Sequence, residues 1–311
     1  MAKRFLVALT SAPVALLVGC HSDDLPTEPP TEVTKVAQGG FIAPSDAVAS
    51  PDGKTFFFSA FSDVADEDGQ RVAGIYKVAA QPGSTAEVLA SGDPLASPMG
   101  LVMSCDGKSV FIADMGRDEG AVYSLSTSGG APADLGATGI FRPAGLAMGP
   151  DCETLFITGL TTDGKPALFT MPLGGGATTV VFSGDPLVSP TGLHVDDDGV
   201  AWVMDHLAAG AKGEGVLWAI TSDGSKCDEV ASDLKMGTPG GVSLTAGGGT
   251  AVIPTVDGTG KGQLTTVSIK TGEVGQVAAP DMIEPAGLRT ARKAGVFAVV
   301  DSEGGAIYSA K

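Results

Sequence analysis

Pro98-Met99-Gly100-Leu101 begins a short apolar segment, and related tetrapeptides recur along the chain. They are Pro143-Ala-Gly-Leu, Pro190-Thr-Gly-Leu, Pro239-Gly-Gly-Val, Pro285-Ala-Gly-Leu and the divergent Pro44-Ser-Asp-Ala. Successive prolines lie 54, 45, 47, 49 and 46 residues apart. A repeat of roughly this length, built from short strands, is typical of one four-stranded blade of a β-propeller. We name this motif the Pro-x-Gly entry, and its six copies predict an all-β, six-bladed propeller.

The second repeat shows the expected plan of a blade. Its apolar runs predict four strands, at residues 100–104, 109–114, 121–126 and 132–137. Asp106-Gly107 and Gly129-Gly130 lie between strands and are typical of hairpin turns. We expect the glycine of each Pro-x-Gly entry to allow a tight turn into the first strand.

The last repeat ends before its fourth strand. After Pro285 the chain has room for three strands only, whereas residues 32–38 read as a strand that precedes the first repeat. Pairing this N-terminal strand with the C-terminal blade would remove two exposed sheet edges. We therefore predict one propeller over residues 32–311, with its ring closed by residues 32–38.

The N-terminus reads as a bacterial export signal. Residues 1–20 combine Lys3 and Arg4 with an apolar run, and Leu17-Val-Gly-Cys20 resembles a lipobox, in which the cysteine is lipidated, with palmitate among the acyl groups. Residues 21–31 are acidic and rich in proline, which suits an extended tether. His21 is not the aspartate associated with inner-membrane retention. These features predict a lipid anchor at Cys20 in the cell envelope, at the outer membrane.

The charge of the chain restricts the classes of partner, and its cysteines indicate a disulfide. The net charge of −17 disfavours nucleic acid, because phosphates would be repelled, and it favours cationic partners. Cys105 and Cys152 occupy the turn between the first two strands of neighbouring repeats, so they are candidates for a disulfide in an oxidising compartment. Cys227 would then remain unpaired.

Aspartates distinguish the even repeats from the odd ones. Because neighbouring strands are antiparallel, the loops that enter the blades share one face of the ring with the loops that follow the second strands. On this face each even repeat carries an aspartate in its entry loop and another after its second strand, namely the pairs Asp93/Asp114, Asp185/Asp205 and Asp281/Asp301. We expect the functional site on this face, which we name the loop face.

Two interpretations of these aspartates stay open. In the first, each carboxylate accepts backbone N–H groups of a turn. In the second, the carboxylates form an anionic mouth for a cationic small molecule or for calcium, with Asp114, Asp205 and Asp301 as the metal ligands. His206, Arg142 and Glu284 are further candidates for ligand contacts on the loop face.

Parts of the chain resemble known propellers. Phe111-Ile-Ala-Asp-Met-Gly-Arg-Asp-Glu-Gly-Ala-Val-Tyr-Ser-Leu and Gly184-Asp-Pro-Leu-Val-Ser-Pro-Thr-Gly-Leu resemble NHL-type repeats and the senescence-marker/gluconolactonase-like propellers. The resemblance implies a propeller over most of residues 32–311, and among its members are hydrolases, lyases and binding scaffolds. The lactonase-like members hold a metal with a glutamate, with asparagines before the entry glycine, and with an aspartate after the second strand. This chain matches the last feature alone, at Asp114, Asp205 and Asp301.

We therefore predict a membrane-anchored envelope propeller that acts as a non-enzymatic scaffold. Its partner would be an envelope protein or a small-molecule ligand. The alternative is a calcium-type lactonase or esterase of the gluconolactonase-like kind, which would require the three aspartates to converge on one ion.

Overall fold

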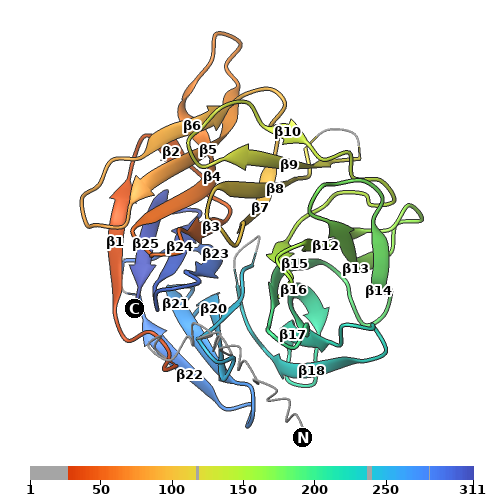
Figure 1. The fold of residues 1–311 in the computed structure, drawn as a ribbon. Coiled ribbons are helices and arrows are strands. Elements are labelled where there is room, and N and C mark those ends of the chain that lie inside the picture. Colours follow the sequence, from red (N-terminus) through yellow and green to blue (C-terminus); the bar gives the residue numbers. More distant parts are fainter. Residues whose placement is uncertain (1–26, 117–118, 237–239, 280) are drawn as a thin grey trace, which may run out of the picture.

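Six antiparallel sheets, five of four strands and one of five, surround a central axis (Figure 1). The structure is a computed structural model that describes residues 27–116, 119–236, 240–279 and 281–311. Those residues form strands, turns and loops without helices, which confirms the predicted all-β, six-bladed propeller. The leader, Cys20 and the first part of the tether lie outside the described residues, and so does Pro239. Within the described part, no helix has the length and apolar character needed to cross a membrane.

Each blade is one sheet, and its strands are arranged side by side in order from the central axis outward. Blade 1 contains β3 (Ala47–Ala49), β4 (Thr55–Ala65), β5 (Arg71–Ala79) and β6 (Glu87–Ser91), with β2 (Phe41–Ile42) added to β4. Blade 2 contains β7 (Pro98–Met103), β8 (Ser109–Asp114), β9 (Ala121–Ser126) and β10 (Ala133–Asp134). Blade 3 contains β11 (Leu146–Met148), β12 (Thr154–Leu160), β13 (Pro166–Pro172) and β14 (Thr179–Ser183).

The other three blades follow the same plan. Blade 4 contains β15 (Pro190–Val195), β16 (Ala201–Ala209), β17 (Glu214–Ile220) and β18 (Cys227–Ser232). Blade 5 contains β19 (Ser243–Leu244), β20 (Thr250–Val256), β21 (Gly262–Ser268) and β22 (Val274–Ala278). Blade 6 contains β23 (Pro285–Thr290), β24 (Phe297–Asp301), β25 (Ala306–Ala310) and, as its outer strand, β1 (Val33–Gln38).

The ring closes through the N-terminal strand. In β1, Val33 pairs with Ala310 and Gln38 pairs with Ala306 of β25. This pairing confirms the predicted closure by residues 32–38. One predicted strand differs: residues 132–137 were expected as the outer strand of blade 2, but β10 is limited to Ala133–Asp134. Pro132 has no N–H to donate to the ladder, which shortens the pairing.

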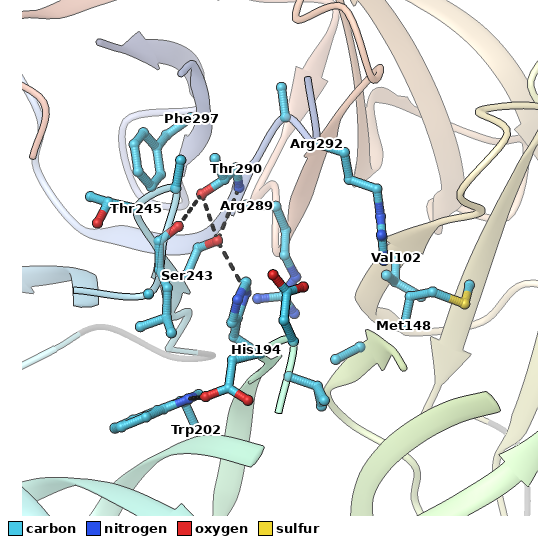
Figure 2. Close-up of a pocket in the computed structure, with 18 of the residues that line it drawn as sticks. Val102, Met148, His194, Trp202, Ser243, Thr245, Arg289, Thr290, Arg292 and Phe297 are labelled. Atoms are coloured by element: carbon cyan, nitrogen blue, oxygen red, sulfur yellow. Dashed lines mark hydrogen bonds between the residues drawn. The ribbon is translucent and has the colours of Figure 1, made fainter. Parts of the chain in front are cut away.

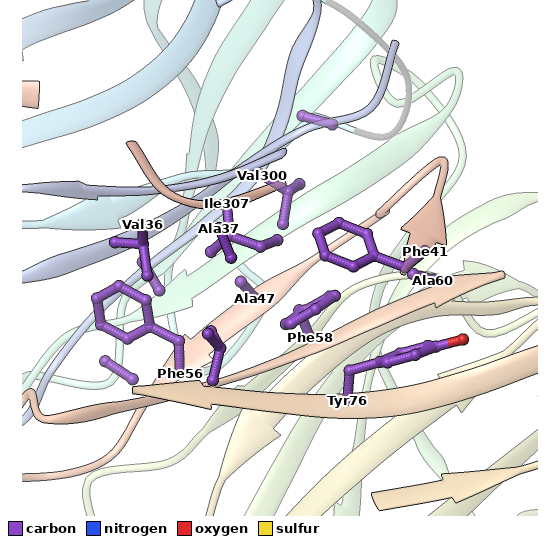
Figure 3. Close-up of a cluster of buried hydrophobic side chains, with 14 of the residues drawn as sticks. Val36, Ala37, Phe41, Ala47, Phe56, Phe58, Ala60, Tyr76, Val300 and Ile307 are labelled. Atoms are coloured by element: carbon purple, nitrogen blue, oxygen red, sulfur yellow. The ribbon is translucent and has the colours of Figure 1, made fainter. Parts of the chain in front are cut away.

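Apolar side chains fill the spaces between neighbouring blades. At the closure, Phe41, Phe58 and Tyr76 form an aromatic cluster, with ring centroids 4.7 Å apart for Phe41 and Phe58 and 5.3 Å apart for Phe58 and Tyr76 (Figure 3). Val36 of β1 and Ile307 of β25 belong to the same cluster. The N-terminal strand is therefore held by side-chain packing as well as by its backbone pairing.

The entry glycines serve close packing at the axis. The inner strands contact one another in sequence, β3–β7–β11–β15–β19–β23, and β23 returns to β3. A Cβ atom on Gly100 would overlap the carbonyl oxygen of Ala144, and one on Gly145 would overlap that of Thr191. Neither glycine has a positive φ. The expectation that this glycine allows a tight turn is therefore wrong. Glycine is needed here because neighbouring inner strands approach closely.

Candidate functional site

A cavity of about 800 Å³ opens at the axis, on the face opposite the loop face. The ends of the inner strands and the turns that follow them line it, so we name this side the pocket face. The loop-face aspartate of blade 2 pairs with Pro98 at the start of β7, whereas Val102 and Met103 at its end line the cavity. Five residues of strand separate the two positions by about 16 Å.

One residue from each entry projects into this cavity. Counting the proline as position 1, these are the residues at position 5, and we name them the fifth-position ring: Val48, Val102, Ala147, His194, Ser243 and Arg289. Blades 1 to 3 contribute the three apolar members, and blades 4 to 6 contribute the three polar ones. Met103 and Met148 extend the apolar half, and Thr245 and Thr290 extend the polar half. The cavity therefore has an apolar wall and a polar wall (Figure 2).

Arg289 forms the floor of the cavity and is 7% exposed. Its guanidinium donates to backbone carbonyls at position 4 of four entries: Nε to Leu101 at 3.4 Å, Nη1 to Val242 and Leu288 at 3.1 Å, and Nη2 to Leu146 at 3.1 Å. Nη2 also lies 3.3 Å from Oδ2 of Asp46. An arginine has five N–H groups in a rigid fork, and these five contacts account for all of them. Arg289 thus joins five blades and closes the axis.

Asp46 supplies the negative charge that this arginine requires. It occupies position 3 of the first entry, where the other five entries have glycine. Its Oδ1 accepts the N–H of Ala47 and its Oδ2 accepts the N–H of Leu101, both at 2.9 Å. Burial raises the pKa of the Asp46 carboxyl, while Arg289 and the two N–H groups act in the opposite direction. A buried charge is tolerated when it is paired and hydrogen-bonded, as here.

A chain of polar side chains forms the wall beside Arg289. Ser243 Oγ lies 3.3 Å from His194 Nδ1 and 2.7 Å from Thr290 Oγ1, and it accepts the N–H of Thr290 at 3.1 Å (Figure 2). Thr290 Oγ1 donates to the carbonyl of Leu244 at 3.0 Å. All these contacts are satisfied when His194 carries its proton on Nδ1.

This Ser–His pair is not arranged for nucleophilic catalysis. Burial, together with the nearby charges of Arg289 and Arg292, lowers the pKa of His194 to about 3. A general base works best when its pKa is near the operating pH, and a base of this pKa takes up protons poorly at neutral pH. Ser243 is also 1% exposed, and its hydroxyl is held by three neighbours. The arrangement holds a neutral, polar wall in place.

Two hydrogen-bond donors at the cavity, Thr245 and Arg292, have no hydrogen-bond partner among the described residues. Thr245 is 4% exposed, and its Oγ1 makes no hydrogen bond. Arg292 is exposed at the rim, and no hydrogen bond or ion pair joins it to a described residue, although the carboxylate of Asp197 acts on it electrostatically. Asp196 already has a partner, because its Oδ2 accepts the Trp202 Nε1–H at 2.9 Å. Thr245 and Arg292 are therefore the groups that a ligand can engage.

A disulfide fastens the rim on the apolar side. Cys105 and Cys152 are bonded across the turns that follow β7 and β11, and their Cα atoms are 5.9 Å apart. Ser104 and Pro150, which line the cavity, are next to these turns. Cys227 is a free cysteine on the outer strand of blade 4, and burial raises the pKa of its thiol to about 11.

On the loop face, the three strand-end aspartates each bind backbone within their own blade. Asp114 accepts the N–H groups of Ala96, Ser97 and Gly116 at 2.8 to 2.9 Å. Equivalent bonds reach Asp205 from Val188, Ser189, Leu207 and Ala208, and reach Asp301 from Ile283, Glu284 and Gly304. All three carboxylates are almost completely buried. They fix each entry loop to the end of the second strand.

The structure does not bring these aspartates together. Among the described residues, no group of three or more histidine, cysteine, aspartate or glutamate side chains is placed to hold a metal ion. In blades 1 and 3 a hydroxyl does the corresponding work: Ser59 Oγ accepts the N–H of Asp46, and Thr158 Oγ1 accepts the N–H of Gly145. Blades 1 and 3 therefore anchor the entry through a hydroxyl, where the even blades use a carboxylate, while in blade 5 the Thr255 hydroxyl bonds to Thr265 instead.

The remaining sequence candidates lie apart from the cavity. Asp93, Asp185 and Asp281 are exposed in the entry loops, and the Asp93–Pro94 and Asp185–Pro186 bonds are cis. Arg142 is exposed, with its backbone N–H bonded to the carbonyl of Glu119 at 2.6 Å. His206 Nδ1 has no partner among the described residues, and Glu284 is partly buried. None of the candidate ligand residues lines the cavity, so a ligand role for them stays a prediction.

Sequence reasoning missed the residues that build the pocket. The available signal was the divergence of the repeats at equal positions: aspartate replaces glycine at Asp46, and arginine replaces a small or apolar residue at Arg289. Each substitution is unremarkable alone, and the two residues are far apart in sequence. Their pairing follows from the closure of the ring.

Comparison with known proteins finds solved structures with a similar fold. No protein-family model matches the chain, and no curated protein matches it. A solved nidogen/laminin complex contains a chain with 19% identity and a TM-score of 0.58, covering 73% of this chain and 82% of that one. A protein of unknown function from Bacteroides thetaiotaomicron has 15% identity and a TM-score of 0.62, with coverages of 90% and 72%. TolB from Acinetobacter baumannii has 14% identity and a TM-score of 0.52, with coverages of 88% and 64%.

These likenesses establish a shared fold. At such identities a propeller scaffold is common to proteins with different activities, so function has to be argued from the site.

Proposed function

We propose that this protein is an exported propeller, anchored through a lipid on Cys20, that binds its ligand in the central cavity without chemically changing it. The leader, the lipobox and the acidic tether support the anchoring. The cavity supports the binding role, since its volume and its mixture of apolar wall and few polar groups suit a small molecule or an extended chain.

The polar wall carries the non-enzymatic part of the proposal. His194 is neutral at physiological pH because its pKa is near 3, and Ser243 is saturated with hydrogen bonds. Neither residue is suited to take a proton or to attack a substrate. The geometry favours a fixed set of donors and acceptors, which recognises a ligand.

A metal-dependent lactonase is the alternative. It would need carboxylates free to bind an ion, yet Asp114, Asp205 and Asp301 each accept three or four backbone N–H groups. Binding an ion there would break these bonds. The observation favours the scaffold over the lactonase.

Calorimetry and hydrolysis assays separate the two functions. The mature protein is titrated with calcium, and a panel of lactones and esters is assayed with and without the metal, alongside Asp205→Asn. We expect no calcium heat and no turnover. Hydrolysis that depends on calcium and is lost in the variant would overturn the scaffold and establish the enzyme.

The anchoring is tested in cells. Labelled palmitate should enter the wild-type protein and not Cys20→Ala, and only the wild type should fractionate with the outer membrane. Equal labelling or equal fractionation of the two proteins would contradict the anchor at Cys20.

A protein partner is consistent with the same scaffold. One structural neighbour is a chain from a solved nidogen/laminin complex. This supports an envelope protein as a partner of the present chain.

A further inference from the structure

We propose that the central cavity is a binding site for amphiphilic carboxylic acids, and that the negative charge of Glu28 in the tether, at the same cavity, opposes their binding. This inference rests on the proposed binding role of the cavity and names the ligand class. It is carried by the path of the tether, by the unpartnered donors and by the apolar wall.

The last residues of the tether are fixed to the C-terminal end of blade 6. The N–H groups of Thr31 and Glu32 both donate to the carbonyl of Lys311 at 2.9 Å, and the N–H of Lys311 donates to the carbonyl of Glu32 at 3.0 Å. Pro30 is buried. The chain therefore enters β1 from the pocket face, and Glu28, an exposed residue, is one of the residues that line the cavity. A carboxylate of the protein itself is thus placed at the site.

The donors at the cavity that have no hydrogen-bond partner among the described residues are Arg292 and Thr245. Arg289 is unsuited to bind it directly, because all five of its N–H groups are engaged and its charge is paired with Asp46. Arg292 has no such commitments among the described residues, and the buried Thr245 hydroxyl lacks a hydrogen-bond partner. Arg292 therefore suits a ligand carboxylate, since a guanidinium is a good donor to carboxylate oxygens, whereas Thr245 lies on the other side of the view in Figure 2.

A ligand that fits the apolar wall needs an apolar body in addition to its carboxylate. Val48, Val102 and Ala147 face the cavity from three consecutive blades, and Met148 lies beside them. In Figure 2, Arg292 lies on the same side as Val102 and Met148, so a head group held by Arg292 leaves an attached aliphatic chain against the apolar wall. Burying such a chain contributes about 0.8 kcal/mol for each methylene.

The acidic rim makes the cavity selective for anions that carry an apolar body. Asp197 and Asp198 are exposed at the mouth, and the chain as a whole is strongly acidic. Small anions without an apolar body are therefore disfavoured by repulsion, which the hydrophobic contacts of a longer acid outweigh. We expect decanoate to bind and acetate to bind far more weakly.

Fluorescence of Trp202 provides the test. The chain has two tryptophans, Trp202 and Trp218, and Trp202 lines the cavity. In the mature protein carrying Trp218→Phe, emission is titrated with decanoate and with decanamide, a neutral ligand of the same length. Each titration is repeated in Glu28→Gln, in Arg292→Gln and in Lys293→Gln, a neighbouring cation that does not line the cavity.

We expect Glu28→Gln to bind decanoate about fivefold more tightly, because a like charge is removed from the cavity. Arg292→Gln should weaken decanoate binding roughly tenfold, while Lys293→Gln and all decanamide titrations should stay unchanged. Equal binding of decanoate and decanamide in every variant would overturn the carboxylate site and leave the proposed scaffold intact.

Two other outcomes are decisive. Dependence on Arg292 without any effect of Glu28→Gln would overturn the role of the Glu28 charge. Absence of binding by both probes would reject amphiphilic acids as the ligand class. Failure of the scaffold itself would show differently, as turnover in the hydrolysis assays described above.

Discussion

The two faces of this propeller use charged residues in opposite ways. On the loop face, buried carboxylates recur in every second repeat, and each serves the backbone of its own blade. On the pocket face, Asp46 and Arg289 each occur once, and together they connect five blades. The comparison teaches that repeated residues build the blades of this chain, whereas residues that break the repeat build its site.

The largest expected effect comes from the floor of the pocket. Asp46→Asn and Arg289→Met should each lower the free energy of unfolding by about 3–5 kcal/mol, because each leaves the other charge buried and unpaired. In the double variant that uncompensated charge is gone, so its loss should be clearly smaller than the sum. Urea unfolding monitored by fluorescence measures all three.

The exposed pair Lys54 and Asp52 is the matched control for the floor. Their charged atoms are 3.8 Å apart and well exposed, so Lys54→Met should leave the unfolding curve almost unchanged. Additive losses for Asp46→Asn and Arg289→Met would contradict the pairing described here.

The disulfide at the rim should follow in size. Cys105 and Cys152 are 47 residues apart, and closing a loop of that length restricts the unfolded chain by about 4 kcal/mol in the chain-entropy model. Replacing both cysteines by serine should lower the unfolding midpoint accordingly. Reducing agent should shift the wild type in the same direction and leave the double variant unaffected; a shift in both would point to another cause.

On the loop face, Asp205→Asn should cost about 2–3 kcal/mol. An amide offers one acceptor oxygen in place of two, so some of the buried N–H groups that Asp205 now satisfies would be left without a partner. Asp185→Asn, at an exposed position of the same blade, should have little effect. The loss should be the same with and without calcium, and a loss confined to calcium-containing buffer would instead favour a metal role.

The smallest effect is a pH dependence on the pocket face. The pKa of His194 is near 3 in the folded protein, below its ordinary value of 6.5. Below pH 6.5 the unfolded chain therefore binds a proton that the folded protein does not, and stability falls by up to about 1.4 kcal/mol per pH unit. Relative to His194→Asn, the wild type should lose about 2 kcal/mol more between pH 7 and pH 5. Parallel stability profiles would contradict a neutral His194 in the folded protein.

Much of the fold was predictable, because its signals are local and repeated. The spacing of the Pro-x-Gly entries set the number of blades, and the missing last strand identified residues 32–38 as the closing strand, as β1 confirms. The role of the entry glycines was predicted wrongly, since the contact that requires them is made with the next blade.

The sequence by itself determined the architecture of this protein, since hydrophobic alternation and turn residues act over a few positions and recur with each blade. Only the tertiary structure decided where the pocket lies and what its charges do. Arg289 bonds to carbonyls 143 and 188 residues away, and its partner Asp46 belongs to the opposite end of the propeller sequence. Such contacts exist only after the ring has closed, because closure brings the same position of six distant repeats to one axis.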